Sequence, residues 1–249
     1  MAQKRNEIVG MDTSFGKIYL IPTPLAEENF SSAVLFNHAI IKDLRVFVVE
    51  ELRTARRFLR KVCPDFPVDD CQFYILNEHT ISTLNVDEII YRVSHGNDVG
   101  IMSEAGLPCV ADPGSELVAL AHAKNIRVVP LVGASSIFMA LMSSGLGGQK
   151  FAFHGYLPTN KTHLATAVRK LEQQSRTEQQ TQIFMETPYR NMQLLETLLK
   201  HCRLETMLCI ACNITDKDEY IQTKSVAQWK QSTLPSLHKK PAVFVLSAR

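Results

Sequence analysis

Two loops of small residues are the first sign of a ligand site in this chain. They are Ser103–Pro108 (SEAGLP) and Val132–Ser136 (VGASS), and each follows a short apolar run. Small side chains allow a ligand to approach the main chain closely. The loops therefore favour a site that holds a ligand through peptide groups, with little side-chain chemistry of its own.

A second sign is an expected helix, Arg53–Val62, that carries arginines on one arc and apolar residues on the opposite arc. The arginines are Arg53, Arg56, Arg57 and Arg60. Guanidinium groups match the geometry of phosphates. The arc is either a solvated helix face or a surface for an anionic substrate. The helix starts directly after an apolar run that ends near Glu50, so its start lies on the same edge of the expected sheet as the two loops. This position favours a surface for an anionic substrate.

The elements that position both loops are typical of a parallel crossover unit. The apolar runs Val99–Met102 and Ile126–Leu131 predict two buried strands. A helix is expected between them, capped by Asp112, with Pro113 and Glu116 in its first turn. In parallel sheets, ligands bind at the carboxyl ends of the strands. Both loops fall at such ends.

The rest of the pattern predicts an α/β protein of two domains, residues 1–132 and residues 133–249. The first sheet is expected to be mostly parallel. The second is expected to be mixed, because Tyr220–Lys224 and Ala242–Ser247 have little helix between neighbours. The other expected strands are Lys17–Ile21, Val46–Val49, Phe73–Leu76, Phe151–Phe153, Thr181–Met185 and Met207–Cys212. The other expected helices are Ala33–Asp43, Asn85–His95, Ser135–Ser144, Thr162–Gln174 and one from near Arg190 to His201.

Composition sets the limits of what the chain can be. Its 249 residues are 45% hydrophobic and 21% charged, with a net charge of +2. A substantial core is expected, and nothing global demands nucleic acid or a membrane. The start, MAQKRNEIVG, has no apolar signal core, and no stretch is long enough to span a bilayer. We expect a cytoplasmic protein without a membrane partner.

Several sequence motifs of common catalytic and binding sites are absent. It contains no GxxxxGK[ST] or GxSxG motif, and its eight histidines show no metal-ligand spacing, so no metal site is expected. Cys209 and Cys212 form a CxxC inside the expected strand Met207–Cys212. Strand alternation would place the two thiols on opposite faces. Plain burial is therefore favoured over a redox or metal role.

Taken together, seven motifs in order along the chain resemble the tetrapyrrole methylase family, which uses S-adenosylmethionine. The branch that they resemble most is that of the 16S ribosomal RNA ribose 2'-O-methyltransferases. The motifs are Lys17–Pro24 (KIYLIPTP), Val49–Leu59 (VEELRTARRFL), Ser103–Gly114 (SEAGLPCVADPG), Val129–Ser136 (VPLVGASS), Gly145-Leu146, Phe153–Pro158 (FHGYLP) and Glu186–Arg190 (ETPYR).

The resemblance implies a homodimer whose two α/β domains hold S-adenosylmethionine in the cleft between them. It also implies which residues contact the cofactor, mostly through the main chain. These are Pro22, Glu104, Ala105, Gly106, Leu107, Pro108, Gly133, Ala134, Ser135 and Ser136, together with Met185, Ala211, Pro241 and Ala242. For Glu104, the alternative is a carboxylate at a helix entry. For Ser135 and Ser136, it is a helix cap.

The implied reaction is methyl transfer by in-line displacement, in which the protein supplies position and exclusion of water. A ribose hydroxyl must lose its proton as it attacks. Glu50 and Glu51 are the candidates for the base, with Arg53 holding a phosphate. The alternative is that either carboxylate only starts the helix.

The motifs that face the substrate depart from the branch, while the cofactor loops match it well. Glu51-Leu52-Arg53 occupies the place where the branch has an acidic residue followed by threonine and arginine. Asn213–Lys217 occupies the place of the branch's segment with glutamate, leucine and threonine-lysine. Three functions therefore remain open. The first is methylation of RNA, with ribosomal RNA as the partner. The second is methylation of a small anionic molecule such as a tetrapyrrole. The third is a cofactor-binding protein that has lost catalysis.

Overall fold

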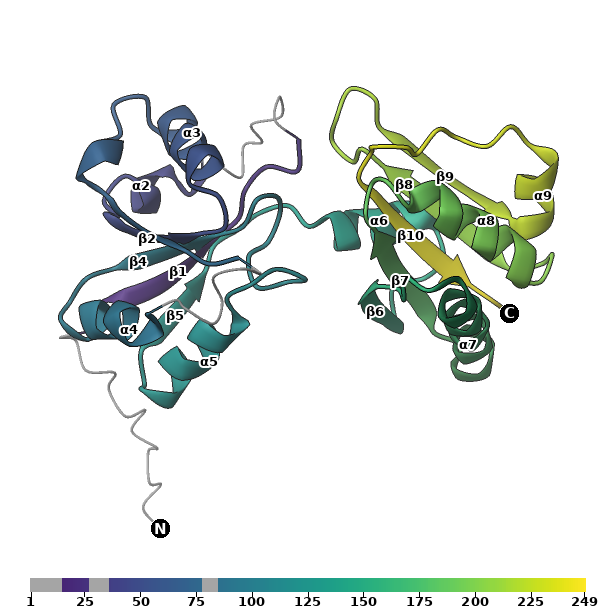
Figure 1. Cartoon of the computed structure of the whole chain (residues 1–249), viewed down its shortest axis with the longest axis horizontal. Helices are drawn as coiled ribbons and strands as arrows, with labels where there is room; N and C mark the ends of the chain where they lie inside the picture. Colours follow the sequence, from purple (N-terminus) through teal and green to yellow (C-terminus); the bar gives the residue numbers. More distant parts are fainter. Residues whose placement is uncertain (1–14, 27–35, 78–84) are drawn as a thin grey trace, which may run out of the picture. The chain divides into compact units, whose positions relative to one another are not determined.

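The computed structural model describes residues 15–26, 36–77 and 85–249. The chain divides into two compact units, Met1–Ala134 (unit 1) and Ser135–Arg249 (unit 2). Each is an α/β unit with its own five-stranded sheet (Figure 1). Within the described ranges, no helix combines the length and the apolar character that a membrane span requires.

The sheet of unit 1 has the strand order β3-β2-β4-β1-β5, and every pairing in it is parallel. The mostly parallel first sheet predicted from the sequence is confirmed. All residues of the adjacent strands β2 and β4 are buried, as expected for parallel strands covered on both faces. The strands are β1 (Lys17–Ile21), β2 (Val46–Val49), β3 (Gln72–Ile75), β4 (Val99–Met102) and β5 (Arg127–Pro130).

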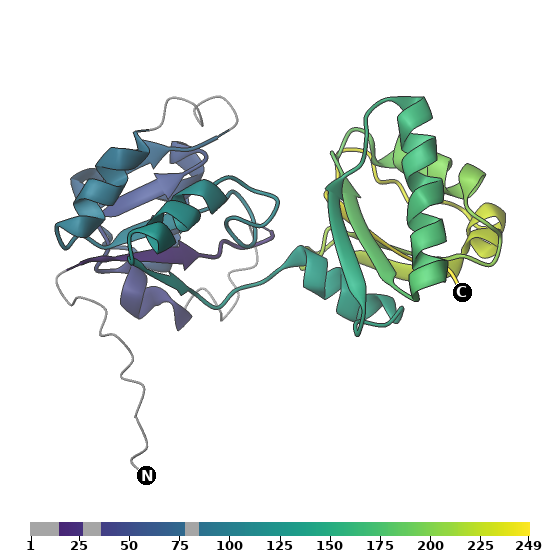
Figure 2. The same cartoon turned by 90° about the horizontal axis from the view of Figure 1, so that it is seen from below.

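Helices cover both faces of this sheet (Figures 1 and 2). On one face, Phe58 and Leu59 of α3 pack with Phe47 and Met102 in one apolar cluster. On the other face, α4 and α5 pack over a second cluster that includes Val48. The helical segments are α2 (His38–Ile41), α3 (Leu52–Val62), the 3-10 turn η1 (Val68–Asp70), α4 (Val86–Ser94) and α5 (Ser115–Ala123). Residues 33–35 of the expected helix Ala33–Asp43 lie outside the described residues.

The start of α5 differs from the prediction. Asp112 does not cap this helix, which begins at Ser115 after Gly114. The backbone is left-handed at Cys109 (φ 66), Ala111 (φ 63) and Gly114 (φ 119). These turns delay the helix, so Asp112 stays in the loop after β4 and its carboxylate is available to the site described below.

The sheet of unit 2 has the order β6-β7-β10-β8-β9 and is mixed, as predicted. The pair β6–β7 is parallel, and the pairs β7–β10, β10–β8 and β8–β9 are antiparallel. The strands are β6 (Phe151–Tyr156), β7 (Thr181–Glu186), β8 (Met207–Cys212), β9 (Tyr220–Ser225) and β10 (Ala242–Ser247).

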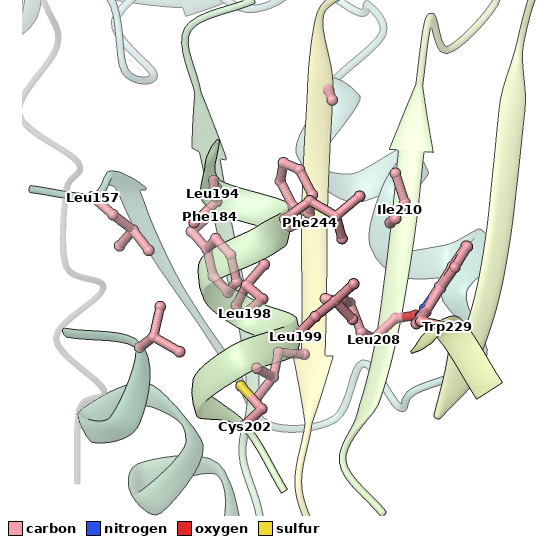
Figure 3. Close-up of a cluster of buried hydrophobic side chains, with 14 of the residues drawn as sticks. Leu157, Phe184, Leu194, Leu198, Leu199, Cys202, Leu208, Ile210, Trp229 and Phe244 are labelled. Carbon is pink, nitrogen blue, oxygen red and sulfur yellow. The ribbon is translucent and has the colours of Figure 1, made fainter. Parts of the chain in front are cut away.

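The core of unit 2 lies between this sheet and three helices, α7 (Lys161–Glu178), α8 (Asn191–His201) and α9 (Val226–Gln231). Phe184 and Phe244 stack at its centre, and Leu194 and Leu198 of α8 lie over them (Figure 3). The indole of the buried Trp229 donates a hydrogen bond to the Leu208 carbonyl at 2.9 Å. The fourth helix, α6 (Ser136–Ser144), packs against β8, β9 and β10.

Two details of unit 2 test the sequence interpretation. Cys212 belongs to the core under α8, whereas Cys209 pairs with Thr223, which binds the Ser144 carbonyl at the end of α6. The two thiols are therefore on opposite faces of β8, as predicted. The expected end of α7 at Gln174 is wrong. The helix continues to Glu178, because Ser175 is buried and accepts a hydrogen bond from the Ala248 N–H at 2.9 Å.

Candidate functional site

The chain leaving β1 is tied to the loop after β4 by main-chain hydrogen bonds. The Thr23 N–H donates to the Gly106 carbonyl at 2.9 Å, and the Gly106 N–H donates to the Thr23 carbonyl at 3.1 Å. The Thr23 hydroxyl also donates to the Ser103 carbonyl at 3.2 Å. The loop Ser103–Pro108 is therefore held in place by β1 and not only by its own strand. Sequence reasoning did not include Thr23 in the site.

The loop after β5 reaches the same place, as the positions of two glycines show. A Cβ on Gly106, whose φ is +84°, would lie 3.7 Å from the Ala134 carbonyl oxygen. A Cβ on Gly133 would lie 2.0 Å from the Cβ of Pro22, so only glycine allows this approach. The buried Asn37 side chain donates to the Val132 carbonyl at 2.8 Å and holds the loop.

The structure thus brings together the unit 1 residues that were expected to contact a cofactor. Pro22, Gly106 and Pro108 are buried, Leu107, Gly133 and Ala134 are half-buried, and Glu104 and Ala105 are exposed. Where the loops meet, a glycine lies next to an alanine and another glycine lies against a proline. A Cβ at Gly133 would collide with Pro22, so this glycine allows the loops to meet, and the exposed Glu104 and Ala105 are the loop positions that a ligand can reach.

Three carboxyl groups lie near these loops. One oxygen of Glu50, at the end of β2, accepts the Glu104 N–H at 3.4 Å. Burial, together with the negative charges of Asp112 and Glu104, raises the pKa of Glu50 to about 7. Burial and Glu104 raise the pKa of Asp112 to about 6. Burial also raises the pKa of Glu104, with a contribution from Glu51. Glu50 consequently changes its charge near neutral pH.

The neighbouring residue Glu51 has a different environment. Its carboxylate caps α3 by accepting the Arg53 N–H at 3.1 Å and the Thr54 N–H at 3.0 Å. These hydrogen bonds lower the pKa of Glu51. The Glu51 carboxylate therefore starts the helix, which is the alternative to its role as a general base. The geometry favours Glu50 over Glu51 as the group that exchanges a proton.

The helix α3 has the two arcs that the sequence predicts. Its apolar arc, Ala55, Phe58, Leu59 and Val62, is buried against the sheet. On the other arc, Arg53, Arg57 and Arg60 are exposed, and Arg56 pairs with Asp69. An open hollow runs along this arc. We call its lining the α3 cationic surface, formed by Arg53, Arg56, Arg57, Arg60 and Lys61.

In unit 2, the expected contact residues gather at one end of the sheet. Met185 of β7 and Ala211 of β8 both pair with Val243 of β10, one on each side. Ala242 is the first residue of β10, and the Pro241 carbonyl accepts the Asn213 N–H at 3.0 Å. Their role toward a cofactor stays a prediction.

The serines at the start of unit 2 have a structural role at α6. The hydroxyl of Ser135 accepts the Phe138 N–H at 3.5 Å and caps the helix, and Ser136 is the first helical residue. This is the helix cap that the sequence offers as the alternative to cofactor contact. Contact with the cofactor stays a prediction for both residues.

The sequence predicts Asp112 at a helix start, but in the structure its carboxyl group lies near those of Glu50 and Glu104. Local sequence around it, Asp112-Pro113-Gly114, has the composition of a helix start, so nothing in the spacing indicated this role. Asp112 stays in the loop because the backbone is left-handed at Cys109 and Ala111. Cysteine and alanine rarely adopt this conformation, so the residue types do not predict it.

Comparison with known proteins agrees with this arrangement. Residues 35–229 match the family model of the tetrapyrrole (corrin/porphyrin) methylases. The chain is 28% identical over 204 residues to ribosomal RNA small subunit methyltransferase I of Synechocystis sp., covering 82% of this chain and 69% of that protein. It is 31% identical over 186 residues to the protein of the same name from Pseudomonas aeruginosa, covering 74% of this chain and 60% of that protein.

Two solved structures share the fold. The methyltransferase CobJ superposes with a TM-score of 0.59 at 14% identity, covering 94% of each chain. The uroporphyrin-III C-methyltransferase from Thermus thermophilus, solved with S-adenosylhomocysteine, superposes with a TM-score of 0.53 at 15% identity, covering 93% of this chain and 97% of that one. Because the family model matches residues 35–229, most of the chain, the chain belongs to the tetrapyrrole methylase family.

Proposed function

We propose that this chain transfers a methyl group from S-adenosylmethionine to RNA, with a ribose 2'-hydroxyl of ribosomal RNA as the acceptor. The observation that carries the proposal is the meeting of the small-residue loops of unit 1 in a member of a methylase family. The names of the curated relatives support ribosomal RNA as the substrate. Such an enzyme works where ribosomes are made, so we keep the expected cytoplasmic location.

S-Adenosylmethionine supplies the activated methyl group on its sulfonium. Pro22, the loop Glu104–Pro108 and the pair Gly133-Ala134 would hold it, chiefly through main-chain groups that small side chains leave accessible. From unit 2, we propose contacts from Ser135, Ser136, Met185, Ala211, Pro241 and Ala242, as the family resemblance implies.

For the acceptor, we propose Glu50 as the general base that takes the proton of the attacking hydroxyl. A carboxylate with a pKa near the working pH serves this purpose best, and the pKa of Glu50 is raised to about 7. Arg53, exposed in the first turn of α3, is proposed to hold a phosphate of the same substrate. Glu51 contributes by fixing the helix that carries Arg53.

The second candidate is a methyltransferase that acts on a small anionic molecule such as a tetrapyrrole. The names of the family and of the two solved structures favour it. The α3 cationic surface suits both kinds of acceptor, since both carry negative charge.

The first prediction is the methyl transfer itself. Incubation with tritiated S-adenosylmethionine and total RNA should place label in RNA, in a nucleoside whose ribose is methylated. A tetrapyrrole extract run in parallel should stay unlabelled. Label in the tetrapyrrole extract alone would contradict RNA as the substrate and favour the second candidate, methylation of a small anionic molecule. Cofactor binding by calorimetry without label in either fraction would indicate that catalysis has been lost.

The second prediction concerns the cofactor loops. Gly106→Ala adds a Cβ at a left-handed position, 3.2 Å from Leu25 and near Ala134, and should weaken S-adenosylmethionine binding by about tenfold or more in calorimetry. Gly147→Ala is the matched control. Gly147 has a similar φ of +87° with nothing within 4 Å of the added Cβ. Equal affinities in the two variants would contradict a cofactor at the Gly106 loop.

The third prediction concerns pH. Because a general base must be deprotonated, kcat/KM should rise as pH increases through about 7, the pKa to which Glu50 is raised. Glu50→Gln should lower kcat/KM by roughly 10²–10⁴-fold and remove this rise. Glu51→Gln is the control and should retain the rise, because Glu51 caps α3 and its pKa is lowered. An active Glu50→Gln enzyme with an unchanged pH profile would exclude Glu50 as the base.

The fourth prediction concerns assembly. We propose that the chain is a homodimer, as the resemblance implies, and two exposed apolar side chains one turn apart on α6 support this. Phe138 is 54% exposed and Met142 is 81% exposed. Met142→Glu should shift the mass measured by light scattering from two chains to one. Leu204→Glu, at a residue 50% exposed elsewhere in unit 2, should leave a dimer. A monomeric parent protein would refute the proposal.

A further inference from the structure

A cavity of about 270 Å³ lies within unit 1, on the flank of α3. Three segments form it: the chain that leaves β1, the end of β4 with the loop that follows, and α3. The lining residues are Thr23, Pro24, Leu25 and Ala26; Met102, Ser103, Glu104 and Ala105; and Thr54, Ala55, Arg57, Phe58 and Lys61. The cavity therefore shares Glu104 and Ala105 with the loop proposed to hold the cofactor. A group bound in the cavity would lie beside that loop.

The lining suits a flat, partly apolar group with hydroxyls at its edge. Phe58, Ala55 and Met102 supply buried apolar surface, and Thr54, Ser103 and Thr23 supply hydroxyl groups. The volume is just below the range of typical ligand pockets, roughly 300–1,000 Å³. A cavity of this size is comparable to one nucleoside, whereas a ring of four pyrroles would extend out of it.

The cavity opens onto the α3 cationic surface. Arg57 and Lys61 line both the cavity and the open hollow along the helix. The surface has five cations. Among the described residues, Asp69 pairs with Arg56, Glu51 lies near Arg53, and Glu104 lies near Arg57, so the five cations outnumber these three carboxylates. Glu104 inside the cavity disfavours a phosphate there, whereas the cations outside favour one.

We propose that α3 is the element that engages RNA. Its cationic surface holds the sugar-phosphate backbone of a single strand, and one nucleoside turns out of the strand into the cavity. This inference rests on the proposed RNA substrate and deepens it. A nucleoside must be unstacked from its neighbours to enter the cavity, so the recognised segment is single-stranded. Phosphates stay on the helix, and the ribose and base go inside.

The charge half of the proposal is tested by the salt dependence of RNA binding. The probe is a fluorescent single-stranded RNA of 12 nucleotides, followed by anisotropy over a salt series. The double variant Arg57→Ala, Lys61→Ala should reduce the slope of log K against log salt by about 1.4, from two phosphate contacts at about 0.7 each. At 0.1 M salt this corresponds to a loss of about 25-fold in affinity.

A matched control removes two cations from another part of unit 1. Lys124 and Arg127 are exposed and lie at the end of α5 and the start of β5, outside the α3 cationic surface. Lys124→Ala, Arg127→Ala should leave the slope unchanged. A similar fall in slope for both double variants would mean that RNA responds only to total charge, which would overturn the proposal.

The cavity half is tested at Thr54, which lines the cavity and binds Glu51 through its hydroxyl at 3.1 Å. Thr54→Phe fills the cavity and should weaken RNA binding by about tenfold with no change in slope, because the phosphate contacts remain. Thr54→Val loses the same hydroxyl without filling the space and should weaken RNA binding far less than Thr54→Phe does. Parental affinity of the Phe variant, or equal weakening by Val, would overturn the cavity as the nucleoside site.

Two readouts separate this inference from the proposed function. Calorimetry with S-adenosylmethionine checks that each variant folds and retains its cofactor site. If the parent labels RNA and the α3 variants label it equally well, the inference fails and the function stands. If the parent binds the RNA with the expected slopes but transfers no methyl group, the function fails and the inference stands.

Discussion

The close approach of three loops at the carboxyl ends of β1, β4 and β5 is the constraint on which the rest of unit 1 depends. Gly133 passes so near Pro22 that a Cβ would lie 2.0 Å from that of the proline, and Gly106 exchanges two main-chain hydrogen bonds with Thr23. Neither contact involves a reactive side chain. A cofactor site built this way, as proposed, would stabilise the bound molecule through position, and the cofactor would bring the reactive group.

Two adjacent carboxylates, Glu50 and Glu51, have different environments and different roles at this edge of the sheet. Glu51 and Glu50 differ by one position, yet helix N–H groups lower the pKa of one while burial and acidic neighbours raise the pKa of the other. The strand β2 ends and the helix α3 begins at this pair. The same turn therefore fixes the cationic helix through Glu51 and directs Glu50 toward the loop at Glu104.

Much of this arrangement could be predicted from the residues because it rests on periodicity. The apolar runs of β2 and β4 and the two arcs of α3 follow from spacing alone, and the structure confirms them. The misses have a different physical origin. The neighbours of Asp112 favour a helix start, but the backbone is left-handed at Cys109 and Ala111, two residue types that rarely adopt this conformation, and the helix begins only after Gly114. The end of α7 was missed because Ser175 is stabilised by Ala248, 73 residues away along the chain.

Overall charge is a poor guide to what this chain can bind, and α3 shows why. A net charge of +2 over 249 residues gives no reason to expect a nucleic-acid partner. The five cations of the α3 cationic surface lie within nine residues of one helix, and three of the described carboxylates, those of Glu51, Asp69 and Glu104, lie near them. A polyanion at this surface responds mainly to charges within about a Debye length, roughly 8–10 Å, because salt screens the others. For the RNA proposed as the substrate, the property that matters is therefore the local concentration of charge on an element that also borders a cavity, and it depends on the fold that places that helix beside the loops.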